Sequence, residues 1–143
     1  MTQPFETALT QIASIIAGVS GIHQAPEHPG ETMNDFPFAA IYLTTGTFGG
    51  GAVGTTKGLY NIAIDVLTNR MNLPNDLAIL NPFIDTVPTA LEAQISGSGQ
   101  RFSNTISAFG DITIQFIPMV DYAGVKMIGY RFVMNDVKIL SNT

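Results

Sequence analysis

The apolar residues of this chain recur with two different periods, which predict two helices and four strands. Apolar residues three or four positions apart predict a helix over Phe5–Val19, because that spacing lines one helical face. The same spacing predicts a second helix over Asn75–Ile95, which its two prolines are expected to bend or split because proline removes a backbone donor. Alternation of apolar and polar residues predicts the strands: Phe38–Thr45, Leu59–Leu67, Thr105–Ile117 and Val125–Leu140.

The order of these elements is helix, two strands, helix, two strands, which predicts one α+β domain over residues 1–143. Consecutive strands usually pair, and two amphipathic helices can cover one face of the sheet that results. We therefore expect a mainly antiparallel sheet of about four strands with both helices packed on one face. The last strand is long, so a bulge is expected near Gly129.

Two long segments rich in glycine and proline, Ile22–Pro37 and Gly46–Gly58, flank the first predicted strand. Segments of this length inside a domain are usually functional or mobile. The glycine-rich segment is either a flexible hairpin tip or a loop that becomes ordered on a partner. The residues of both segments that we regard as candidate partner contacts are His23, His28, Phe48, Gly49, Gly50, Gly51, Val53 and Lys57.

Charged residues are scarce, and this changes the expected function. Asp, Glu, Lys and Arg make up 12% of the 143 residues, compared with about 25% in an ordinary soluble domain. No Lys or Arg precedes Lys57. Depletion of charge marks the cores of protein interfaces, so an assembly protein covered by other subunits is favoured over a domain with a neutral polar surface. The net charge of −5 argues against nucleic-acid binding through a basic patch.

No pattern in the chain predicts catalysis or a cofactor. Cysteine is absent, which excludes disulfides and thiolate chemistry. Lys57 follows glycines but is itself followed by Gly58, so the phosphate-binding order G-x-x-x-x-G-K-[ST] is missing. His23 and His28 lie near glutamates, but no recognised third ligand follows, and solvated loop histidines are the favoured interpretation. The expectation is a protein that is not an enzyme, with no metal and no cofactor.

The chain also lacks the features of a membrane protein or a secreted one. Its longest apolar stretches, such as Ile12–Val19, are too short to span a bilayer. The N-terminus has no basic region followed by an apolar core, so no secretory signal is expected.

Three segments carry a resemblance to a known family. They are the proline-rich stretch from Ile22 to Tyr42 after the first helix, the strand Tyr60–Leu67 that leads into a helix, and the closing Asp121–Val125 and Ile128–Phe132. In this pattern the chain resembles the tail terminator proteins of long-tailed bacteriophages, including related minor tail and neck components. The glycine-heavy Gly46–Gly58 connection departs from the pattern of the family.

The resemblance implies a structural protein of the virion, assembled in the host cytoplasm. Such subunits close into a homo-oligomeric ring, commonly a hexamer, which caps the tail tube, ends its polymerisation and meets the neck and connector proteins. DNA passes through the lumen without specific binding. The alternatives are a head-completion or tail-tube component and, in a different class, a small metabolic enzyme or ligand-binding α+β domain.

Overall fold

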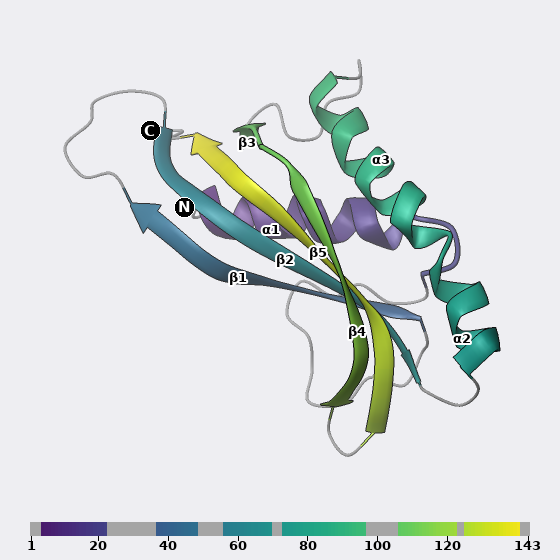
Figure 1. Ribbon diagram of the computed structural model, residues 1–143. Coiled ribbons are helices and arrows are strands. Elements are labelled where there is room, and N and C mark those ends of the chain that lie inside the picture. Colours follow the sequence, from purple (N-terminus) through teal and green to yellow (C-terminus); the bar gives the residue numbers. More distant parts are fainter. Residues whose placement is uncertain are drawn as a thin grey trace.

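An antiparallel sheet forms the centre of the molecule, with its helices beside and behind it (Figure 1). The computed structural model describes residues 4–22, 37–48, 56–69, 73–96, 106–122 and 125–140. The elements follow the predicted order and confirm the α+β fold. They are α1 (Pro4–Ala17), β1 (Phe38–Phe48), β2 (Thr56–Asn69), α2 (Leu73–Leu80), α3 (Phe83–Ser96), β3 (Ile106–Ala108), β4 (Ile112–Tyr122) and β5 (Val125–Leu140).

The sheet is four strands wide. Its order is β1-β2-β5-β3, and β4 also pairs with β5. Since β3 pairs with the C-terminal end of β5 and β4 with the rest, β3 and β4 follow one another along the same side of β5. The outer strands are therefore β1 on one side and the β3–β4 pair on the other. Every pairing is antiparallel.

The prediction of one continuous strand over Thr105–Ile117 was wrong, because residues 109–111 separate β3 from β4. The cause lies in the partner strand, where a bulge at Asn135–Asp136 shifts the register. Around this bulge the Gly110 amide donates to the Asn135 carbonyl oxygen at 2.7 Å, and the Asn135 amide donates to that of Asp111 at 3.1 Å. Asp136 itself has a φ of 57°, a left-handed value that Asp tolerates better than most residues.

The interruption of the second helix at its first proline is confirmed. The chain turns at Asn81–Pro82, and α3 starts where the Thr86 amide and hydroxyl both donate to the Pro82 carbonyl oxygen, each at 3.2 Å. Pro88 does not split the helix, since α3 continues past it for two further turns. The side-chain oxygen of Asn81 accepts a hydrogen bond from the Tyr130 hydroxyl at 2.8 Å, which ties this corner to the sheet.

The main core lies between the helices and one side of the sheet, which we call the helix face. Figure 1 shows α1 crossing behind the strands on this side. Ile12 and Ile16 of α1 are fully buried there, together with Ile64 of β2 and Phe132 of β5. Burial of each such side chain stabilises the fold by about 1.5–3 kcal/mol.

The opposite side of the sheet, which we call the second face, carries a smaller apolar cluster and several polar side chains. The register places Tyr42, Asp65 and Arg131 here, since alternate residues of a strand point to opposite sides. The apolar cluster lies toward one end of this face and consists of Phe38, Ala40, Leu67 and Met127, with Ile117 and Val120 packed against it.

Asn61 joins irregular positions on both of its neighbouring strands. The pairing of β1 with β2 shifts between Leu43 and Thr45, and that of β2 with β5 shifts between Tyr60 and Ile62. Between them, the Asn61 side-chain amide donates to Thr45 Oγ1 at 2.7 Å, and its side-chain oxygen accepts from the Asp136 amide at 3.0 Å. The Asn61 side chain therefore accepts from a backbone amide at the bulge of β5 and also ties β2 to the Thr45 hydroxyl of β1.

The bulge expected near Gly129 is not in β5, which pairs regularly with β2 on both sides of this residue. The register shift beside Gly129 is in the pairing with β4, where the extra residue lies in β4 between Ile117 and Val120. The glycine is required there for a steric reason. A Cβ at this position would overlap the carbonyl oxygen of Val66 on the neighbouring strand.

Candidate subunit interface

A three-residue polar cluster crosses three strands on the second face. Asp65 of β2 is only 8% exposed. Its carboxylate accepts hydrogen bonds from the Tyr42 hydroxyl at 2.9 Å and from Arg131 Nε and Nη2 at 2.8 and 3.2 Å. The Arg131 guanidinium also lies 6.0 Å from the centroid of the Tyr42 ring, within the range of a cation–π contact.

This cluster is electrostatically satisfied, which argues for a structural role. Burial, followed by the hydrogen bond to Asp65, raises the pKa of Tyr42 to about 12. The hydrogen bond to Asp65 also raises the pKa of Arg131 above its ordinary value. Tyr42 is therefore a neutral donor at any physiological pH, and Asp65 has its carboxylate oxygens occupied by two partners. Neither group is placed to abstract a proton from a substrate.

We expect the Tyr42→Phe variant to lose less stability than the wild type in alkali. The phenol has a pKa of 10.0 without these contacts and about 12 in the folded chain. The stabilisation of the fold by the neutral Tyr42 phenol is therefore complete below pH 10 and is lost as the pH rises through 12. Solvent screening at this half-buried site limits the difference to about 1 kcal/mol. Urea unfolding of both proteins on either side of pH 10 measures it, and an equal alkaline loss in the two would contradict this description of Tyr42.

The two outer strands present long edges without charge. β1 has eleven residues and none of them is charged, while β4 has only Asp121 near its end. Within the described ranges, β1 pairs only with β2, and β4 pairs only with β5. Soluble monomers usually protect such edges with charged side chains, because unpaired backbone groups invite pairing with another chain. Proline also discourages pairing at a sheet edge, and Pro118 is the only proline on β4. The preceding residues Ile112–Ile117 contain neither a proline nor a charged side chain.

Large apolar side chains are exposed on both of these strands and on the same side of the sheet. Leu43 of β1 is 44% exposed, and Ile114 and Phe116 of β4 are 40% and 42% exposed. The register places all three on the helix face, where Leu43 is opposite Ile62 and Ile114 is opposite Phe132. The Phe116 ring lies 5.5 Å from that of Tyr130 and leaves its other side open. The helices therefore cover the middle of this face but not its margins.

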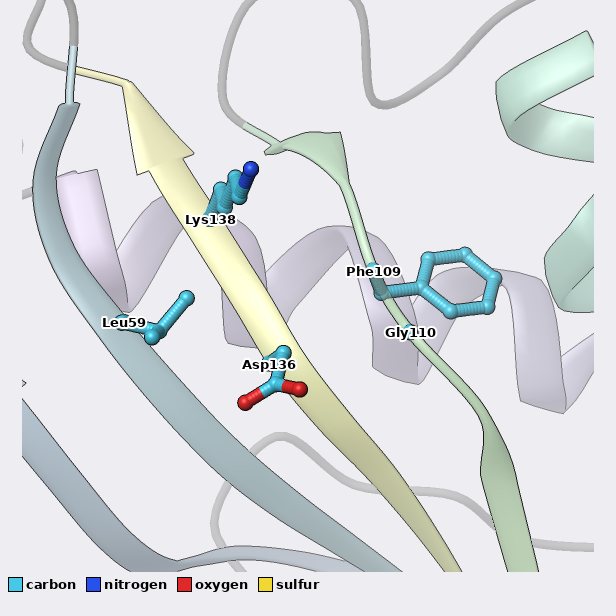
Figure 2. Close-up of a pocket in the computed structure, with 5 residues that line it drawn as sticks. All are labelled: Leu59, Phe109, Gly110, Asp136 and Lys138. Carbon is cyan, nitrogen blue, oxygen red and sulfur yellow. The ribbon is translucent and has the colours of Figure 1, made fainter.

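A shallow hollow of about 440 Å³ lies at the end of the sheet where β3 gives way to β4. Figure 2 shows the Leu59, Asp136 and Lys138 side chains on adjacent strands, with the Phe109 ring directed away from them. Gly110 completes the lining. The hollow thus offers one carboxylate and one ammonium group beside an exposed leucine. This set does not form a nucleophile and base pair.

Most of the candidate partner contacts that the sequence suggested lie outside the described residues. The structure therefore does not test whether they contact a partner. His23, His28, Gly49–Gly51 and Val53 lie outside the described ranges. Phe48 is the last residue of β1, and Lys57 is the second residue of β2. Both therefore belong to strand ends at the hairpin between β1 and β2, and not to a separate loop. The connection between these two strands is shorter than the expected Gly46–Gly58, because β1 continues past Gly46, which pairs with Tyr60 of β2.

Sequence reasoning missed Leu43, Ile114 and Phe116 as surface residues. The alternation over Thr105–Ile117 places Ile114 and Phe116 on one side of their strand, but it does not show how much of that side another element covers. A signal was present, since Ile112–Val120 is a strand of nine residues without a charge. Such a strand is either central in a sheet or an edge that another chain covers.

The described part of the chain contains no group of three His, Cys, Asp or Glu side chains that could hold a metal ion. None of its helices has the length and apolar character needed to cross a membrane.

The uncharged edges of β1 and β4, with the apolar side chains beside them, are the strongest candidate for a functional surface. The Tyr42, Asp65 and Arg131 cluster stabilises the sheet between these edges. In comparisons with known proteins, the chain matches no protein-family model and no curated protein sequence.

Proposed function

We propose that this protein is a structural subunit that assembles head to tail into a ring, and that the ring is the tail terminator of a long-tailed bacteriophage. The observation that carries the assembly is the pair of outer strands β1, which has no charge, and β4, which has none before Asp121, with exposed Leu43, Ile114 and Phe116. A monomer gains nothing from such edges and risks aggregation through them. The low charge of the whole chain supports the same proposal, since covered surfaces need no charge for solubility.

The more specific part of the proposal comes from the resemblance of the Ile22–Tyr42, Tyr60–Leu67, Asp121–Val125 and Ile128–Phe132 segments to terminator proteins. In this role the ring stops growth of the tail tube and offers its far side to the neck. The net charge of −5 is compatible with a lumen through which DNA passes, because few basic side chains are present to hold phosphates.

Molar mass in solution, measured by light scattering over a range of concentrations and followed by negative-stain imaging, tests the proposal. Closed rings of one size are expected. Long tubes would instead identify a tail-tube subunit, which stacks its rings. A monomer at every concentration would contradict self-assembly and would favour a small ligand-binding domain, for which the hollow beside Asp136 and Lys138 is the place to search.

A further inference from the structure

We propose that β4 of one copy pairs with β1 of the next copy in antiparallel direction, so that one sheet continues from subunit to subunit. This inference rests on the proposed ring and specifies the contact that builds it. The partner is a second copy of this chain, and the surface it occupies is the edge of Ile112–Ile117 with which no described strand other than β5 pairs.

The directions of the strands permit this contact in a ring. The pairings β1–β2, β2–β5 and β5–β4 are all antiparallel. It follows that β1 and β5 run one way and β2 and β4 the other. Copies related by rotation about an axis along the strands therefore bring β4 of one beside an oppositely directed β1 of the next. Contacts of this kind, between two different patches, are those that close rings.

A two-fold pair of β4 strands is the main competing arrangement, and it fits the surface less well. It would bury Ile114 and Phe116 but leave the uncharged β1 strand and its exposed Leu43 uncovered in both copies. The head-to-tail contact covers both edges of every copy at once.

The sides on which the side chains lie restrict the register. Directly opposite residues of an antiparallel pair point to the same face. Leu43 and Ile114 both lie on the helix face, and placing them opposite one another also puts Tyr42 opposite Gln115 on the second face. The regular part of each strand allows this, because β1 is regular from Phe38 to Leu43 and β4 from Ile112 to Ile117.

In this register the exposed side chains complement each other on both faces. On the helix face, Leu43 of one copy covers Ile114 and Phe116 of its neighbour. On the second face, Gln115 lies opposite Arg131 within its own copy. Its amide can then donate to the hydroxyl oxygen of Tyr42 in the next copy, whose own proton goes to Asp65. The polar cluster thereby extends from copy to copy.

Disulfide trapping tests this pairing directly, since the chain has no cysteine of its own. The double variant Leu43→Cys, Ile114→Cys places one thiol on each outer strand. Within one copy the two strands are separated by β2 and β5, roughly 14 Å in all, which is too far for a disulfide. In the proposed contact the Cβ atoms lie about 5 Å apart. Mild oxidation is expected to give a ladder of covalent multimers on a non-reducing gel.

The matched control is Leu43→Cys, Thr113→Cys, because Thr113 is adjacent in sequence but lies on the second face. We expect at least tenfold less cross-linking from it. The single variant Ile114→Cys is expected to remain uncrosslinked, and a covalent dimer from it would establish the two-fold β4 pair instead. Rings that form without preferential Leu43–Ile114 cross-linking would overturn this contact while leaving the ring intact. Absence of rings would overturn the proposed function itself.

A charge on the edge gives an independent test that needs no oxidation. Ile114→Lys is expected to weaken assembly at least tenfold in sedimentation or light scattering, with an unchanged melting temperature at concentrations below those at which the wild type assembles. The control is Ile79→Lys, since Ile79 is similarly exposed, at 47%, but lies on α2. Assembly of Ile114→Lys at the wild-type concentration would contradict the proposed pairing.

Discussion

The Gly129→Ala variant is expected to lose about 3 kcal/mol of unfolding free energy, at the upper end of the usual cost of overpacking. Gly129 lies in β5 opposite Leu67 of β2, in the regular part of the longest strand pairing in the sheet and close to the end at Met127. A methyl group there would overlap the Val66 carbonyl oxygen and come within 2.8 Å of a Leu67 methyl carbon. The first of these is a backbone atom, so the two central strands would have to separate locally.

Chemical denaturation followed by circular dichroism measures this effect. Gly18→Ala is the matched control, because its new Cβ would lie 3.4 Å from the nearest neighbouring atom, an ordinary contact. The control is expected to change the unfolding free energy by less than about 0.5 kcal/mol. Equal stability of the two variants would mean that β2 and β5 do not approach one another as closely as described.

The Asp65→Ala variant is expected to lose about 2 kcal/mol. The substitution removes the acceptor of both Tyr42 and Arg131 at once. Breaking a buried ion pair by removing one partner costs about 3–5 kcal/mol. The Arg131 side chain keeps 36% of its surface exposed, so water can replace part of the lost contact and the cost is lower.

The double variant Asp65→Ala, Arg131→Met separates the cost of leaving Arg131 without its carboxylate partner from a general effect of altering β2. It removes the stranded guanidinium and is expected to lose less than Asp65→Ala alone. The matched surface change is Asp85→Ala on α3, whose carboxylate is exposed, with an expected loss below about 1 kcal/mol. If Asp65→Ala and Asp85→Ala had the same stability, the cluster would contribute nothing to the sheet.

The parts of the fold that depend on local pattern could be predicted from the sequence. The alternation within β2 and β5 places Ile62, Ile64 and Phe132 on the apolar side of their strands, and all three are fully buried. The proline in Asn81–Pro82 identified the interruption between α2 and α3. These features depend only on residues close in the chain, so a period and a missing backbone donor suffice to predict them.

The features that were missed depend on residues far apart in the chain. The break between β3 and β4 follows from a bulge at Asn135–Asp136, which lies on a different strand. The ion pair of Asp65 and Arg131 joins residues 66 positions apart. Alternation also shows the side on which Phe116 points, but not how far the helices extend over that side. Most candidate contact residues lie outside the described ranges, so the sequence-based interpretation of the glycine-rich segment stays a prediction.

The free energy of a contact between two uncharged strands comes from main-chain hydrogen bonds and from apolar side chains leaving water, and not from ion pairs. β1 and most of β4 are strands of this kind. Simple salts screen ion pairs but barely weaken such a contact, and sulfate or phosphate strengthens it. The apolar contribution also falls as the temperature is lowered. Copies of this chain joined through β1 and β4 would therefore stay together in concentrated salt and associate more weakly in the cold.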